Sequence, residues 1–145
     1  MEKDFDRWNV GKKKLDRDLP VADCHEREIW WCAIGVNVGS EQHSQTGDFS
    51  RPVVVVRRFT RDLFWAIPLT TKLKDVSFRK RLVVGDIEND ALILQMRSYD
   101  RKRLIRKIAM VPKKAFKELQ RAIIAAILKT TNPALAGSSE AEANV

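Results

Sequence analysis

The chain has 145 residues, of which 44% are apolar and 32% are charged, and its formal net charge is +8. This length favours one domain with its own core, and this composition excludes a disordered chain. A pI of about 9.8 favours a polyanionic partner. No apolar run reaches the roughly 18 residues of a membrane span, and the first residues lack the apolar segment of a signal peptide, so we expect a cytoplasmic protein.

Residues 1–27 mix charges of both signs around a few apolar side chains. The spacing of Phe5, Trp8 and Leu15 predicts a short helix that docks through Phe5 and Trp8 and breaks at Gly11 or soon after. We therefore expect residues 1–27 to form an N-terminal extension that rests on the main domain.

Short apolar runs bounded by turn-forming residues predict β-strands in the middle of the chain. The expected strands are residues 28–34, 52–58, 63–69, 80–84, 91–96 and 105–111. Residues 35–50 are expected to form a long polar loop, and residues 85–90 a turn. Short neighbouring strands with tight links indicate a curved, mostly antiparallel sheet that closes partly into a barrel.

The clearest helix begins at Pro112, because proline is tolerated in the first helical turn. Its apolar residues fall on one face, and Asn132-Pro133 prevents its continuation beyond about Lys129. Residues 131–145 contain almost nothing to bury and predict a disordered tail. The expected fold is therefore mainly β (α+β): a small curved β-barrel over residues 28–130, with a C-terminal helix and a short N-terminal helix.

The two cysteines, Cys24 and Cys32, are expected to be reduced thiols, with Cys32 buried in a strand. A disulfide is disfavoured, and a zinc site of Cys24, His25 and Cys32 lacks the short paired spacing of such sites. The sequence also lacks the carboxylate cluster of a two-metal nuclease. We therefore expect neither a metal site nor a cofactor.

Three polar side chains, Glu41, Arg51 and Thr70, stand where strands meet loops. RNA cleavage without a metal requires a base for the 2′-hydroxyl, an acid for the leaving 5′-oxygen and donors for the phosphoryl oxygens. Glu41 suits the base, Arg51 binds phosphate through its planar fork, and Thr70 can donate a hydrogen bond. Each also has a structural interpretation: Glu41 as a loop carboxylate, Arg51 paired with Asp48, and Thr70 bonded to backbone.

Other residues suit contacts with nucleic acid. Gln95 and Arg97 share one face of a strand end, where Gln95 can read a base edge and Arg97 can either meet phosphate or pair with Asp100. A dense basic run follows, made of Arg101, Lys102, Arg103, Arg106 and Lys107, and can attract a phosphate backbone. His43 is a conventional acid–base residue, but its polar loop favours a solvated side chain.

Aromatic residues offer stacking surfaces for unpaired bases. Trp30 and Trp31 are adjacent in an expected strand, as are Phe64 and Trp65, so only one member of each pair can face the core by simple alternation. Core or interface positions are the simpler interpretation for both tryptophans of the first pair. Phe49, in the loop before the valine run, is the better stacking candidate.

Four motifs occur in a telling order: Gly39-Ser40-Glu41-Gln42, then Arg51-Pro52 with its valine run, then Pro68-Leu69-Thr70-Thr71, then Gln95-x-Arg97-x-x-Asp100-x-x-Arg103-Leu104. Together they closely resemble the MazF/PemK family of toxin endoribonucleases, over about residues 28–129. The resemblance implies an SH3-like β-barrel homodimer. It also implies metal-independent, sequence-specific cleavage of single-stranded RNA to 2′,3′-cyclic phosphate and 5′-hydroxyl ends, and neutralisation by a cognate antitoxin.

By position, Arg51 and Thr70 match the catalytic residues of that family, and Glu41 matches its loop glutamate. The residues expected to bind RNA are Gln42, Phe49, Thr71, Lys72, Gln95 and Arg97. The chain departs from the family in two ways: residues 43–50 separate Glu-Gln from Arg-Pro, and Leu92 and Leu94 stand where some members have an Arg and an Asp. The alternatives are a non-catalytic toxin of this fold that binds a protein such as DNA gyrase, and a plain RNA-binding barrel.

Overall fold

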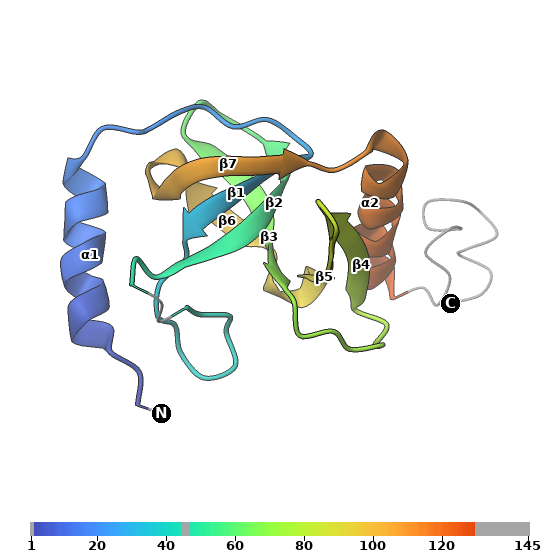
Figure 1. Ribbon diagram of the computed structural model, residues 1–145, viewed down its shortest axis with the longest axis horizontal. Coiled ribbons are helices and arrows are strands. Elements are labelled where there is room, and N and C mark those ends of the chain that lie inside the picture. The colour runs from blue at the N-terminus through green and yellow to red at the C-terminus, as the bar shows by residue number, and fades with distance from the viewer. Residues whose placement is uncertain (1, 45–46, 130–145) are drawn as a thin grey trace.

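The computed structural model describes residues 2–44 and 47–129 (Figure 1). Its elements, in chain order, are α1 Phe5–Arg17, β1 Glu28–Ala33, β2 Ser50–Arg58, β3 Leu63–Thr70, β4 Arg79–Val84, β5 Ile87–Leu92, the 3-10 turn η1 Ile93–Gln95, β6 Arg97–Asp100, the 3-10 turn η2 Arg101–Arg103, β7 Leu104–Met110 and α2 Lys113–Leu128. The tail expected over 131–145 lies outside the described residues. No helix in the described ranges is long and apolar enough to cross a membrane.

The strands form one curled antiparallel sheet in the order β4-β5-β3-β2-β1-β7, and β6 pairs with β3. β3 belongs to both halves of the curl, because its residues 63–66 pair with β6 and its last two residues pair with β5. α2 stands beside β4, whereas α1 lies at the far end of the molecule (Figure 1). The mainly β fold with a C-terminal and an N-terminal helix is therefore confirmed.

The valine run of β2 is buried on both faces, which explains its continuous apolar character. Val54 packs in the cluster that α2 covers, whereas Val53 and Val55 pack in a second cluster on the other face of the strand. Trp30 and Phe64 are buried in the second cluster, while Trp31 is partly exposed and Trp65 is exposed. The alternation predicted for both aromatic pairs is confirmed.

Cys24 and Cys32 are free thiols buried in this second cluster. Cys32 lies in β1, as expected, and is completely inaccessible to solvent. Burial raises the pKa of the Cys24 thiol to about 11 and that of the Cys32 thiol to about 12.

The boundary between β4 and β5 differs from the prediction. The turn expected over 85–90 covers only residues 85–86, and β5 ends at Leu92, so the strand expected over 91–96 is wrong. Asn89 and Asp90 misled the prediction, because they are turn formers that lie buried inside β5. Asn89 Nδ2 donates to the carbonyl of Ile87 at 3.1 Å, and other donors satisfy Asp90.

The N-terminal helix is longer than predicted. α1 continues through Gly11 to Arg17, and at its N-cap the Asp4 carboxylate accepts from the Arg7 amide at 2.9 Å. Trp8 is its one buried residue, whereas Phe5 is 47% exposed and does not anchor the helix as expected.

α1 is fixed to the loop that follows β1. The Trp8 ring lies on Gly35, which has a φ of +80°, and a Cβ at this position would overlap the ring. Lys3 Nζ donates to the carbonyls of Asn37 at 2.7 Å and Gly39 at 2.8 Å. Trp8 of α1 and Lys3, just before the helix, therefore hold the two ends of the 35–39 segment.

Candidate functional site

Arg51 and Thr70 border one solvent-open depression of about 590 Å³. Arg51 stands near the start of β2 and Thr70 at the end of β3. The antiparallel register pairs Val53 with Pro68, so continuation of the same register brings Arg51 opposite Thr70. Both residues are half-buried. The structure thus brings together the two residues that the sequence suggested for phosphate chemistry.

The Arg51 guanidinium is held by neutral acceptors. Nη2 donates to the carbonyl of His43 at 3.1 Å, and Nη1 donates to the carbonyl of Leu69 at 3.4 Å. With its amide oxygen turned towards the guanidinium, Gln42 accepts from Nε at 3.1 Å and from Nη2 at 2.9 Å. Burial lowers the pKa of Arg51, because desolvation penalises the charged form.

None of the described carboxylates forms an ion pair with Arg51. Asp48, the partner considered from the sequence, instead accepts from the backbone amide at the start of β2 at 3.2 Å. The charge of Arg51 is therefore available to an anion that enters the depression.

Gln95 positions the loop that carries Gln42. Its Oε1 accepts from the backbone amide of Gln42 at 2.9 Å, and its Nε2 donates to the carbonyl of Ser40 at 3.1 Å. Asn37 Nδ2 adds a bond of 2.7 Å to the carbonyl of Gln42. These bonds orient Gln42 towards Arg51, so Gln95 serves the site as a clamp on the loop.

Glu41 lies in a neighbouring depression of about 450 Å³ and does not line the one that holds Arg51 and Thr70. It shares this second depression with Gln95 and Arg97, and its side chain is exposed. Gln42 lines both depressions and connects them. The structure therefore groups Glu41 with residues expected to bind RNA.

Arg97 lies with its guanidinium 4.9 Å from the centre of the Tyr99 ring. The alternative ion pair of Arg97 with Asp100 is not among those of the described residues, and Asp100 accepts from the Lys102 backbone amide at 2.8 Å.

Phe49 does not offer a stacking surface, contrary to the prediction. Its side chain is 5% exposed and packs against Trp8, with ring centroids 5.3 Å apart. A left-handed backbone, with a φ of +56°, turns it under α1. Trp31 instead borders the depression that holds Arg51 and keeps part of its ring accessible.

Sequence reasoning missed two residues of this depression, which also contains the expected Thr71 and Lys72. His43, expected to be solvated, lines it and is half-buried. Arg79 enters it from β4, where its Nη1 donates to the carbonyl of Lys72 at 2.9 Å. The sequence analysis gave Arg79 no role, and only the pairing of β4 with β5 distinguishes this residue.

Asp90 anchors the edge of the site. It is 1% exposed and accepts from the Lys74 amide at 2.7 Å, from Arg81 Nε at 3.1 Å and from Arg79 Nη1 at 3.4 Å. Desolvation raises its pKa, but the hydrogen bonds from Lys74 and Arg81 outweigh burial and hold the pKa below its ordinary value.

Asp90→Asn is expected to destabilise the fold by about 2 kcal/mol at neutral pH, because a buried carboxylate with charged donors is lost. Because the folded-state pKa is depressed, this stabilisation is present above the ordinary carboxyl pKa of 3.8 and is lost as pH falls below it. Urea unfolding of both proteins at several pH values measures the gap, which should shrink below about pH 4.

Asp75→Asn is the matched control, since Asp75 pairs with the same Arg81 at 3.1 Å but its side chain is 93% exposed. We expect this variant to unfold at nearly the same urea concentration as the wild type. Equal losses in the two variants would contradict the role given to Asp90.

The described residues contain no group of three or more His, Cys, Asp and Glu side chains that could hold a metal ion. In particular, Cys24, His25 and Cys32 form no such group.

A comparison with protein families matches residues 25–127 to the PemK-like, MazF-like toxins of type II toxin-antitoxin systems. The chain belongs to this family. The match begins after α1, so the N-terminal helix lies outside the matched residues. No curated protein matches the sequence.

Solved MazF structures share the fold. MazF of Deinococcus radiodurans superposes with a TM-score of 0.60 at 21% identity, covering 74% of this chain and 98% of that one. A MazE–MazF structure from the same organism gives 0.54 at 20% identity, covering 74% and 96%. Toxin MazF-mt6 of Mycobacterium tuberculosis gives 0.54 at 16% identity, covering 70% and 96%. At these identities the likeness shows the fold alone.

Proposed function

We propose that this PemK/MazF-family toxin is a sequence-specific endoribonuclease that cleaves single-stranded RNA without a metal ion and leaves 2′,3′-cyclic phosphate and 5′-hydroxyl ends. The observation that supports it most is the placement of Arg51 and Thr70 in one open depression, with the guanidinium charge uncompensated by the described carboxylates. The family membership of the chain supports the same activity.

In the proposed reaction, the ribose 2′-oxygen attacks the adjacent phosphorus, its proton passes to a base, and the bond to the 5′-oxygen breaks as that oxygen gains a proton. Arg51 stabilises the phosphoryl charge through its positive charge and the second N–H of Nη1, since its other N–H groups donate to Gln42, His43 and Leu69. Burial lowers its pKa, which also makes it a better proton donor to the leaving oxygen. Thr70 Oγ1 accepts from the Lys72 amide at 3.2 Å, so its hydroxyl proton can point to a phosphoryl oxygen.

Two residues compete for the role of base. Glu41 is the family's loop glutamate by position, but it lines the neighbouring depression. His43 lines the same depression as Arg51 and Thr70, and its carbonyl accepts from Arg51 Nη2 at 3.1 Å, which supports its imidazole as the base. Because a base must reach the proton it removes, we assign this role to His43 and a substrate-positioning role to Glu41.

The two connected depressions suit RNA on either side of the scissile bond. Thr71 and Lys72 are exposed beside Thr70, whereas Gln42 and Arg97 lead along the second depression. We further propose that the toxin acts as a homodimer in the cytoplasm and is neutralised by an antitoxin with an acidic segment. The occurrence of MazE–MazF complexes among proteins of the same fold supports such a partner.

Purified protein is expected to cut a long single-stranded RNA in the presence of EDTA and to leave a duplex of the same sequence intact. The fragments should accept a 5′-phosphate from a polynucleotide kinase without prior phosphatase treatment, and sequencing of their 5′ ends should reveal a short shared motif. RNA that is bound but never cut would indicate a plain RNA-binding barrel. Neither binding nor cleavage would favour a toxin directed at a protein.

A further inference from the structure

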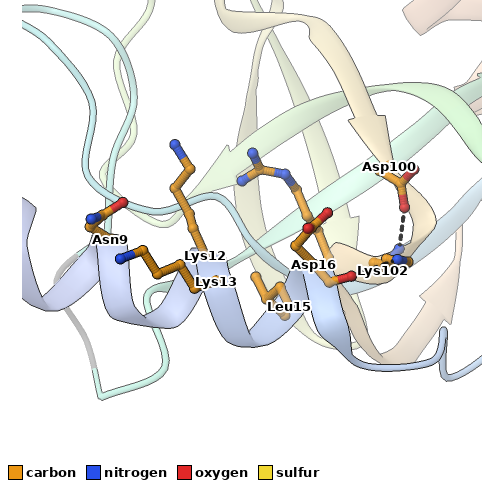
Figure 2. Close-up of a pocket in the computed structure, with 8 residues that line it drawn as sticks. Asn9, Lys12, Lys13, Leu15, Asp16, Asp100 and Lys102 are labelled. Carbon is orange, nitrogen blue, oxygen red and sulfur yellow. Dashed lines mark hydrogen bonds between the residues drawn. The ribbon is translucent and has the colours of Figure 1, made fainter.

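A cleft of about 400 Å³ separates α1 from the β6–β7 connection, away from the two depressions already described. Asn9, Lys12, Lys13 and Asp16 border it from α1, and Lys102 and Arg103 border it from η2 (Figure 2). The α1 residues have the spacing i, i+3, i+4 and i+7, which puts them on one helical face. A helix outside the residues matched to the family therefore supplies one wall of this cleft.

Both walls are held in place. Lys102 Nζ donates to the carbonyl of Asp16 at 2.7 Å and so joins η2 to α1. Arg103 Nη1 donates to the carbonyl of Ala33 at 3.0 Å, and its guanidinium lies 5.7 Å from the centre of the Trp8 ring. The cleft is thus formed before any ligand arrives, which lowers the entropy cost of binding.

The charge of the cleft is positive and partly uncompensated. It is lined by four cations, Lys12, Lys13, Lys102 and Arg103, and by the carboxylates of Asp16 and Asp100, so its net charge is +2. Elsewhere on α1, Arg7 pairs with Asp4 and Lys14 pairs with Asp18. Lys12 and Lys13 form no ion pair with any carboxylate in the described ranges, so both ammonium groups are available to an anion.

Arginines connect the cleft to the second depression. Arg97 lies 4.9 Å and Arg103 lies 6.0 Å from the centre of the same Tyr99 ring, and they border the second depression and the cleft respectively. A chain of cations therefore leads from the Gln42 end of the candidate site to α1. Charges spaced in this way suit a continuous polyanion better than a single small anion.

We propose that this cleft is an accessory binding site for the phosphate backbone of single-stranded RNA, and that α1 extends the RNA path beyond the residues that cut. The proposal rests on the proposed function for the identity of the ligand. In it, Lys12 and Lys13 contact phosphates, Arg103 continues the path from Arg97, and Asn9 offers an amide to a base or ribose.

The test compares Lys12→Ala/Lys13→Ala with Lys113→Ala/Lys114→Ala, which removes two adjacent exposed lysines from α2 at the opposite end of the molecule (Figure 1). Fluorescence anisotropy measures binding of 2′-O-methyl RNA, which lacks the attacking hydroxyl, at lengths of about 4 and about 20 nucleotides. For the longer RNA we expect Lys12→Ala/Lys13→Ala to weaken binding about tenfold. The negative slope of the logarithm of the association constant against log[salt] should become shallower by about 1.4. The shorter RNA should bind as before, and the α2 variant should bind both RNAs nearly as the wild type does.

Equal effects of the two double variants, or equal losses for both RNA lengths, would overturn the proposal. If RNA binding is unchanged while binding of poly-glutamate is weakened, the cleft belongs to an acidic protein and the proposal is also overturned. Because the probe cannot be cut, the result does not depend on catalysis. Failure of the nuclease assignment would appear separately, as intact RNA in the cleavage assay.

Discussion

Arg51→Ala should reduce the rate of RNA cleavage by at least about 10³-fold, because it removes both the donors to the phosphoryl oxygens and the proposed proton donor. Arg51→Lys keeps the charge but lacks the planar fork, so we expect it to lose about 10²-fold. Single-turnover cleavage of a defined RNA in EDTA measures both rates, and circular dichroism checks that each variant is folded.

Arg57→Ala is the matched control for this experiment. Arg57 lies on the same strand, is exposed, and places its guanidinium 4.7 Å from the centre of the Phe59 ring, outside the depression. It should cut RNA almost as well as the wild type. Full activity of Arg51→Ala would refute the assignment, and a larger loss for Glu41→Gln than for His43→Gln would reverse our choice of base.

Gly35→Ala should destabilise the protein by about 3 kcal/mol, because it adds the strain of a left-handed alanine to a steric overlap with the Trp8 ring. Gly39→Ala isolates the first effect. Gly39 has a φ of +55° with no atom within 4 Å of the added Cβ, so we expect a loss of about 1 kcal/mol. Chemical denaturation of the two variants measures the difference.

A double-mutant cycle with Trp8→Ala tests the cause of the larger loss. Once the indole is removed, Gly35→Ala should cost only about as much as Gly39→Ala, which is a strongly non-additive result. Additive effects of Trp8→Ala and Gly35→Ala would show that the overlap with the indole is not what makes Gly35 necessary.

Local patterns predicted the parts of this fold that depend on neighbouring residues. The valine run, the alternation of Trp30 with Trp31 and the helix after Pro112 follow from periodicity and from the chemistry of proline. Arg51 and Thr70 were found because motifs at strand ends mark both, and the register of β2 and β3 then brings them together.

The errors arise where distant contacts override local preference. Phe49 looked exposed in its polar loop, but Trp8, far away in sequence, covers it. Asn89 and Asp90 looked like a turn, but the guanidinium groups of β4 and the Lys74 amide satisfy Asp90 inside a strand. Arg79 and His43 belong to the candidate site for a similar reason, since only the folded sheet and loop bring them to Arg51.

The buried position of the two cysteines gives this protein a built-in probe of local opening. Cys24 and Cys32 are 2% and 0% exposed, and their raised pKa values keep both thiols protonated and unreactive at neutral pH. An alkylating reagent can therefore reach Cys32 only in molecules whose barrel has opened, and Cys24 only where the segment before β1 has moved away. The rate of alkylation then reports the frequency of opening, and any ligand that closes the molecule more tightly slows it without the need for an attached label.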